Sequence, residues 1–104
     1  MTEAGVPTDC SNATGMIPRG IMTPLVTPFT EREEIDLPGL RRVIDHVING
    51  GVHAIFALGT TSEFVALDDR ERRFVMEKTI EFVNHRVPVW VGVASCATRH
   101  SIDL

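Results

Sequence analysis

A run of hydroxyl side chains after a short apolar segment offers the clearest chemistry in the chain. Ala54–Leu58 is apolar without alternation, and Gly59–Glu63 follows it with Thr60, Thr61 and Ser62 in its centre. Glycine lets the backbone approach a ligand closely, and hydroxyls beside amides without strand partners suit a carboxylate or a phosphate. The same residues would also suit a turn whose hydroxyls bond only its own backbone. The pattern predicts one of these two arrangements.

The other reactive side chains form no catalytic or metal-binding pattern. Lys78 is the single lysine, and it falls in a predicted helix, off the apolar face. An exposed helix face lacks the desolvated pocket that lowers a lysine pKa, so we interpret Lys78 as a surface residue. We interpret Cys96 as a small packed residue rather than a reactive thiol. The histidines lack metal-ligand spacing, so no metal site is expected; they are His46, His53, His85 and His100.

Three strands are predicted to position these residues, over 21–27, 54–58 and 88–93. Pro24 removes one hydrogen-bond donor from the first strand, which is expected to be irregular or to start late. The second and third strands have no polar side, which is typical of a parallel sheet covered on both faces.

Helices are predicted between the strands. Asp36 is placed to cap the first helix, which ends at Gly50 and Gly51. Asp68 and Glu71 fit a capping box for a second helix that runs to about residue 83. A third helix is expected to begin after a cap at residue 98. The predicted inner faces carry Leu37, Leu40, Val43, Ile44, Val47 and Ile48 in the first helix and Val75, Met76, Thr79, Ile80 and Val83 in the second.

The alternation of strands and helices predicts an α/β fold, either a barrel or an open doubly wound sheet. Ligands bind beyond the carboxyl ends of parallel strands. Three segments therefore qualify for a site: residues 27–29, 59–63 and 92–98. The chain stops inside the third helix, so we expect it to be part of a larger domain.

Four segments resemble the dihydrodipicolinate synthase/N-acetylneuraminate lyase family in order and spacing: Leu25–Phe29, Gly59–Glu63, Leu67–Arg72 and Arg86–Val93. The resemblance spans residues 21–104. It implies a (β/α)8 barrel and a class I aldolase, in which a lysine forms a Schiff base with pyruvate or a related 2-oxo acid. A closed barrel needs roughly 250 residues. At 104 residues, the chain is expected to be the amino-terminal part, about three β/α units.

The resemblance also implies roles for individual residues. Thr61 would bind the carboxylate of the 2-oxo acid through its hydroxyl and amide, and Thr60 would join a proton relay with tyrosines. Thr27 would line the floor of the site, and Gly59 would let the backbone approach the substrate. Glu63 would brace the loop.

Some positions depart from the family pattern. The family usually has glycine where this chain has Ser62, so a positive φ at that position would strain the turn. The bulk of Phe64 is expected to narrow substrate choice. The chain has no tyrosine, so the tyrosines and the Schiff-base lysine are expected beyond Leu104. The chain alone is therefore expected to be inactive.

Three functions stay open at this point. The first is the amino-terminal portion of a Schiff-base lyase, with residues 1–19 as a flexible leader and 20–104 as a partial barrel domain. Thr60 and Thr61 favour the dihydrodipicolinate synthase branch, whereas Ser62 and Phe64 point toward a sugar-acid member. The second is a short non-catalytic product that acts by binding, and the third is a phosphate-binding α/β protein.

Composition limits the partners. The net charge of -4 argues against a nucleic-acid partner, and no apolar run is long enough to span a membrane. Two cysteines far apart favour a reducing cytoplasm. We expect no cofactor, and the resemblance implies that the parent is a homo-oligomer, a tetramer or a dimer.

Overall fold

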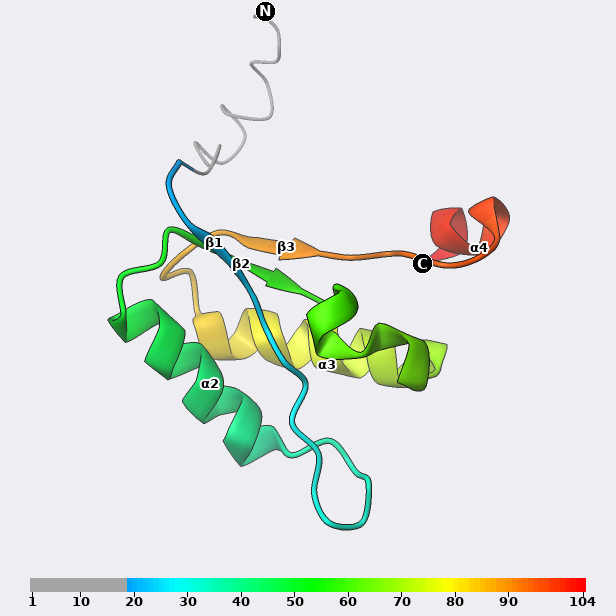
Figure 1. Cartoon of the computed structure of the whole chain (residues 1–104), viewed down its shortest axis with the longest axis horizontal. Helices are drawn as coiled ribbons and strands as arrows, with labels where there is room; N and C mark the ends of the chain where they lie inside the picture. Colours follow the sequence, from blue (N-terminus) through cyan, green and yellow to red (C-terminus); the bar gives the residue numbers. More distant parts are fainter. Residues whose placement is uncertain (1–18) are drawn as a thin grey trace, which may run out of the picture.

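Three strands form one parallel sheet in the computed structural model, which describes residues 19–104 (Figure 1). β1 (Met22–Pro24) pairs with β2 (Ala54–Ala57), which pairs with β3 (Val89–Val91). Helices follow the strands, as predicted for an α/β protein. The leader expected over residues 1–19 lies, apart from its last residue, outside the described part of the chain.

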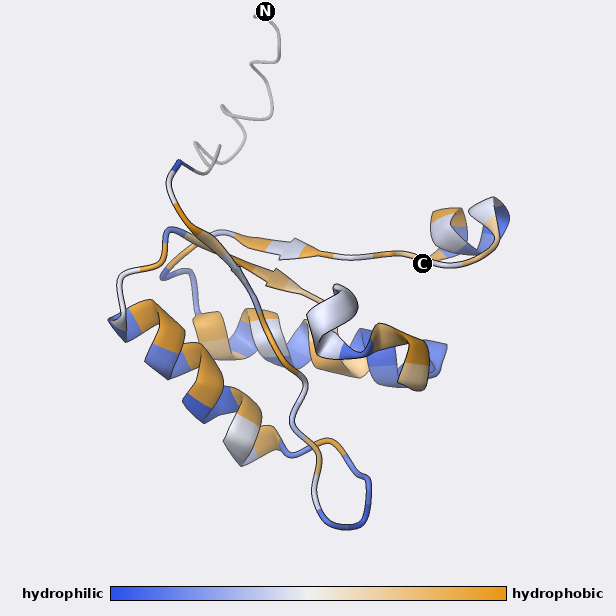
Figure 2. Ribbon diagram, in the orientation of Figure 1, coloured by the Kyte–Doolittle hydropathy of each residue, from blue (hydrophilic) through white to orange (hydrophobic). Residues whose placement is uncertain are grey.

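The first helix, α2 (Leu37–Asn49), has the predicted amino-terminal cap. The carboxylate of Asp36 accepts a hydrogen bond from the amide of Gly39 at 3.0 Å. Figure 2 shows that α2 is divided lengthwise into an apolar and a hydrophilic side. On the apolar side Leu40 and Ile44 are fully buried, and the rest of the predicted stripe packs against them. The prediction of this helix and its inner face is confirmed.

The second helix, α3 (Asp69–Val83), begins with the predicted capping box. The amide of Glu71 donates to the Asp68 carboxylate, and the Glu71 carboxylate accepts from the Asp68 amide, both at 2.8 Å. Ile80 was predicted on the inner face but is 49% exposed. It lies almost opposite Phe82, which packs on the core beside α2, because residues two apart point to different sides of a helix.

Both α2 and α3 lie on the same side of the sheet (Figure 1). The core there joins Leu25 and Ile55 from the strands to Ile44 and Val83 from the helices. Side chains alternate along a strand, so the neighbours of Ile55 and Val89 in register point to the other face. These are Phe56, which is half-buried, and Trp90, which is exposed, and neither α2 nor α3 lies on their side of the sheet (Figure 1).

The third strand therefore differs from its prediction. It was expected to be buried on both faces, but Trp90 is 49% exposed because β3 is an edge strand in this chain and its outer face is bare. The last helix, α4 (Thr98–Asp103), lies apart from the sheet, beyond the end of β3 (Figure 1). Its cap is Ala97 rather than Thr98, and it makes no side-chain capping bond. No helix in residues 19–104 is long and apolar enough to cross a membrane.

Candidate functional site

The turn between β2 and α3 stands at the carboxyl end of β2 and contains two short 3-10 helices, η1 (Thr60–Ser62) and η2 (Phe64–Ala66). Leu58 and Glu63, at φ 60° and 58°, have left-handed backbone conformations. Ser62 does not. A positive φ, the condition under which serine would strain the turn, is therefore not met at Ser62, and Leu58 and Glu63 adopt the left-handed conformations instead.

Ser62 joins the ends of two strands. Its side chain is buried, with 1% exposed. The hydroxyl accepts a hydrogen bond from the amide of Leu58, at 3.0 Å, and donates to the carbonyl of Leu25 just beyond β1. The hydroxyl thus serves the backbone, as the second arrangement predicted from the sequence required.

Thr60 and Thr61 behave differently. Both are exposed, and neither their amides nor their hydroxyls have a hydrogen-bond partner among residues 19–104. Backbone hydrogen bonds from the two residues that follow fix the conformation of Thr60 and Thr61. The amide of Ser62 donates to the carbonyl of Gly59, and the amide of Glu63 donates to the carbonyl of Thr60, both at 3.0 Å. Two adjacent residues therefore offer four donors to solvent on one side of the turn. The arrangement in which hydroxyls bond the turn's own backbone is therefore present at Ser62, whereas ligand binding by Thr60 and Thr61 stays a prediction.

Gly59 is needed for space rather than for its backbone conformation. Its φ of -85° is ordinary. A Cβ atom there would come within 2.6 Å of the Phe56 ring, which no real contact allows. The backbone of the turn consequently lies tight against the bare face of the sheet.

Thr27 follows β1, three residues beyond Pro24. The regular part of the strand ends at Pro24 rather than starting late, and the amide of Leu25 still bonds the carbonyl of Phe56 at 3.0 Å. Thr27 is two residues beyond Leu25, whose carbonyl holds Ser62, and only 3% of it is exposed. The bond from Ser62 to Leu25 thus ties the second predicted segment to the chain two residues before the first. The roles of Thr27, Gly59, Thr60 and Thr61 toward a substrate stay predictions.

The third predicted segment contains a hydrogen-bonded chain that sequence reasoning missed. The Ser95 hydroxyl and His100 Nδ1 are 2.8 Å apart, and His100 Nε2 lies 2.8 Å from an Asp69 oxygen at the start of α3. The bond from His100, aided by the nearby arginines, lowers the pKa of Asp69 below its ordinary value. Arg72 adds a bond to the carbonyl of Ala94 at 2.9 Å. These contacts tie α4 and its loop to α3.

Cys96 and Lys78 complete the predicted candidates. Cys96 was expected to be packed but is exposed, in the loop between β3 and α4. Lys78 lies at the surface as predicted, 3.0 Å from the Glu81 carboxylate and above the ring of Phe74. No group of three or more potential metal ligands occurs in the described part of the chain.

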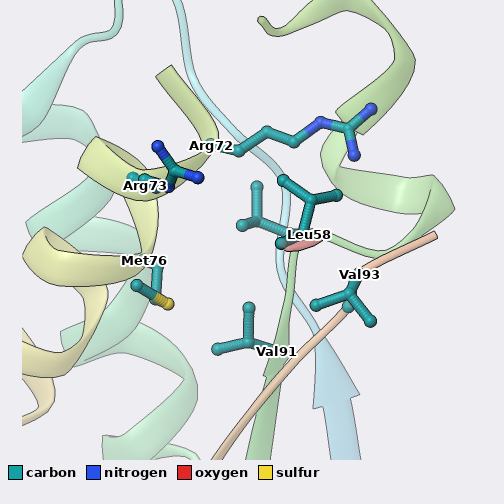
Figure 3. A pocket seen from close by; sticks show the side chains of 8 residues that line it. Leu58, Arg72, Arg73, Met76, Val91 and Val93 are labelled. Carbon is teal, nitrogen blue, oxygen red and sulfur yellow. The ribbon is translucent and has the colours of Figure 1, made fainter. Parts of the chain in front are cut away.

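A hollow between α3 and β3 adjoins the turn only at its first residue, Leu58 (Figure 3). Met76 and Val91 line one end and Val93 the other, with Leu58 between them. None of the four predicted site residues borders it. We therefore place the candidate site at the β1 and β2 ends, not in this hollow.

The comparisons with known proteins agree with this arrangement. The profile of the dihydrodipicolinate synthetase family matches residues 17–104. A DapA-like lyase of Thermococcus onnurineus is 46% identical over 86 residues, and a 4-hydroxy-tetrahydrodipicolinate synthase of Salinibacter ruber is 41% identical over 87 residues. These alignments cover 83% and 84% of this chain and 29% of each relative.

A solved structure is similar as well. The YagE protein of Escherichia coli K12, crystallised in complex with pyruvate, is 37% identical with a TM-score of 0.78. The match covers 81% of this chain and 28% of YagE. The likeness is to the amino-terminal part, three β/α units, of a (β/α)8 barrel. The chain belongs to the dihydrodipicolinate synthetase family.

Proposed function

We propose that this chain is the amino-terminal portion of a Schiff-base lyase that acts on pyruvate or a related 2-oxo acid. Residues 20–104 would supply the first three β/α units of its barrel domain. The observation that carries the proposal is the pair Thr60 and Thr61, whose four donors have no acceptor in residues 19–104 and stand at the carboxyl end of β2. Active sites of β/α barrels lie at that end of the strands.

The chemistry of the turn suits a carboxylate. Thr61 would bind one end of the 2-oxo acid through its amide and hydroxyl, because charge-assisted hydrogen bonds are about twice as strong as neutral ones. Thr60 would pass a proton through its hydroxyl. Thr27 and Gly59 would shape the floor of the site. YagE, which shares the family, was crystallised with pyruvate, and this supports the same substrate class here.

The amine that attacks the substrate carbonyl would come from a lysine outside this chain. Lys78 is paired with Glu81 at the protein surface, outside any apolar pocket of the kind that activates a lysine nucleophile. In the complete enzyme an amine and the carbonyl of pyruvate would form an imine and release water. Carbon–carbon bond formation or cleavage would then proceed through the enamine.

Reductive trapping tests this proposal. Borohydride added with pyruvate should reduce the imine and leave a permanent adduct on the complete protein, on a lysine beyond residue 104. The 104-residue chain should stay unlabelled. Absence of an adduct on the complete protein, together with protection against unfolding by inorganic phosphate and none by pyruvate, would favour a phosphate-binding protein instead.

A further inference from the structure

We propose that Ser62 is a positioning residue, whose buried hydroxyl holds Thr60 and Thr61 in the geometry that binds the substrate carboxylate. This inference rests on the proposed function. Ser62 cannot touch substrate itself, because only 1% of it is exposed and its hydroxyl is occupied both as donor and as acceptor.

The two hydrogen bonds of the Ser62 hydroxyl fix the turn at both ends. Ser62 is the last residue of η1, and its hydroxyl bonds the amide of Leu58 and the carbonyl of Leu25, a residue 37 positions away. Thr60 and Thr61 lie between these anchors. Their side chains make no hydrogen bond within residues 19–104, so the anchors on either side set their position.

Removal of the hydroxyl would leave the two backbone groups without partners. The amide of Leu58 is buried, and it cannot bond a neighbouring strand instead. The left-handed backbone conformation of Leu58 directs the amide away from the hydrogen bonds of the sheet. A buried polar group without a partner is costly, so the turn would shift to find water. Such a shift moves the donors of Thr61 relative to the carboxylate, which weakens ground-state binding more than the chemical step.

The test measures KM and kcat separately in the complete enzyme. We expect Ser62→Ala to raise the KM for pyruvate about tenfold and to change kcat less than about threefold, since one well-placed hydrogen bond corresponds to roughly that factor in binding. Ser62→Gly, which carries the residue usual in the family, should behave in the same way and should fold.

Thr79→Val is the matched control. Thr79 is another fully buried hydroxyl, in α3, and it has no hydrogen-bond partner in the described structure. Its loss should leave KM unchanged. A Ser62→Ala enzyme with the KM of the native enzyme, or with only a lower thermal midpoint and less active protein, would overturn the positioning role. A native enzyme that is not trapped by borohydride and pyruvate would instead overturn the proposed function, and the Ser62 assignment with it.

Discussion

Thr61 offers a carboxylate two donors, its amide and its hydroxyl, where no acceptor in residues 19–104 competes for either. A carboxylate that leaves water loses strong hydrogen bonds, so a binding site must return them in a fixed geometry. The first residues of a helical turn have unpaired amides by construction. The turn thus provides donors without the long cationic side chains that would have to be ordered on binding.

We predict that Thr61→Ala in the complete enzyme raises the KM for pyruvate by about tenfold to a hundredfold. A hydrogen bond to a charged group contributes about 1.5–3 kcal/mol, and each 1.4 kcal/mol is a factor of ten. Steady-state kinetics with pyruvate as the varied substrate would measure the change. Thr61→Ser, which keeps the hydroxyl, should retain most of the affinity. Equal KM values for the alanine and native enzymes would show that Thr61 does not bind pyruvate.

For single residues, the sequence predicts which side chains can form hydrogen bonds in the turn. It does not predict which of them bond the backbone and which stay free to bind a ligand. The hydroxyl run was predicted as a binding turn or as a self-satisfied one, and the local pattern could not decide. The decision depends on the Leu25 carbonyl, which is distant in sequence and close in space. Gly59 shows the same limit, since the Phe56 ring, not a backbone angle, excludes a side chain there.

Helix and strand positions were predictable where local chemistry sets them. The caps at Asp36 and Asp68 arise within one turn of chain, so sequence alone located both helix starts. The burial of Ile80 and Trp90 depends on what packs against them, and residues 19–104 leave each of them 49% exposed. The link from α4 to α3 could not be foreseen either, because His100 and Asp69 are 31 residues apart.

We predict that Asp69→Asn loosens α4 at neutral pH. The native carboxylate accepts from His100, which lowers the Asp69 pKa below 3.8 in the folded chain. Because the pKa of Asp69 is lower in the folded chain, its carboxylate stabilises the fold at pH values above its pKa in the unfolded chain. That stabilisation is lost as the pH falls through the folded-state pKa. Amide hydrogen exchange of α4 should be about two- to fivefold faster in the variant at pH 7, since the contact is exposed.

The pH dependence separates this contact from a general effect. The difference between native and Asp69→Asn exchange should vanish at a pH below the lowered pKa of Asp69, where both chains are uncharged at this position. Glu77→Gln is the control, because Glu77 is an exposed acid on α3 with no ion pair in the described residues. A native chain whose α4 exchanges as fast as the Asp69→Asn chain at pH 7 would contradict the prediction.

The sheet of residues 19–104 has one face covered by helices and one face that no helix of this part covers. α2 and α3 pack on one side of the sheet, while Pro24, Val26, Phe56 and Trp90 lie toward the other and are exposed or half-buried. The chain spans about 29% of the length of the relatives it matches. In a barrel the same face points to the interior, where side chains from the other strands fill it.

We predict that the 104-residue chain associates with itself through this bare face. Exposed apolar area and two unpaired strand edges favour contact between copies, because burial of one large apolar side chain contributes about 1.5–3 kcal/mol. Sedimentation at rising concentration should show assembly. The emission of Trp90, the single tryptophan, should shift to shorter wavelength as assembly buries its ring.

Two lysine substitutions test where the contact lies. Val26→Lys places a charge on the bare face, where Val26 is 46% exposed beside the Leu25 that faces the helices, and it should weaken assembly about tenfold or more. Val65→Lys adds the same charge on η2, at a side chain that is already 80% exposed, and should leave assembly unchanged. Equal effects of the two variants would show that net charge controls association. A monomer at every concentration with solvent-exposed tryptophan emission would show that the bare face does not drive it.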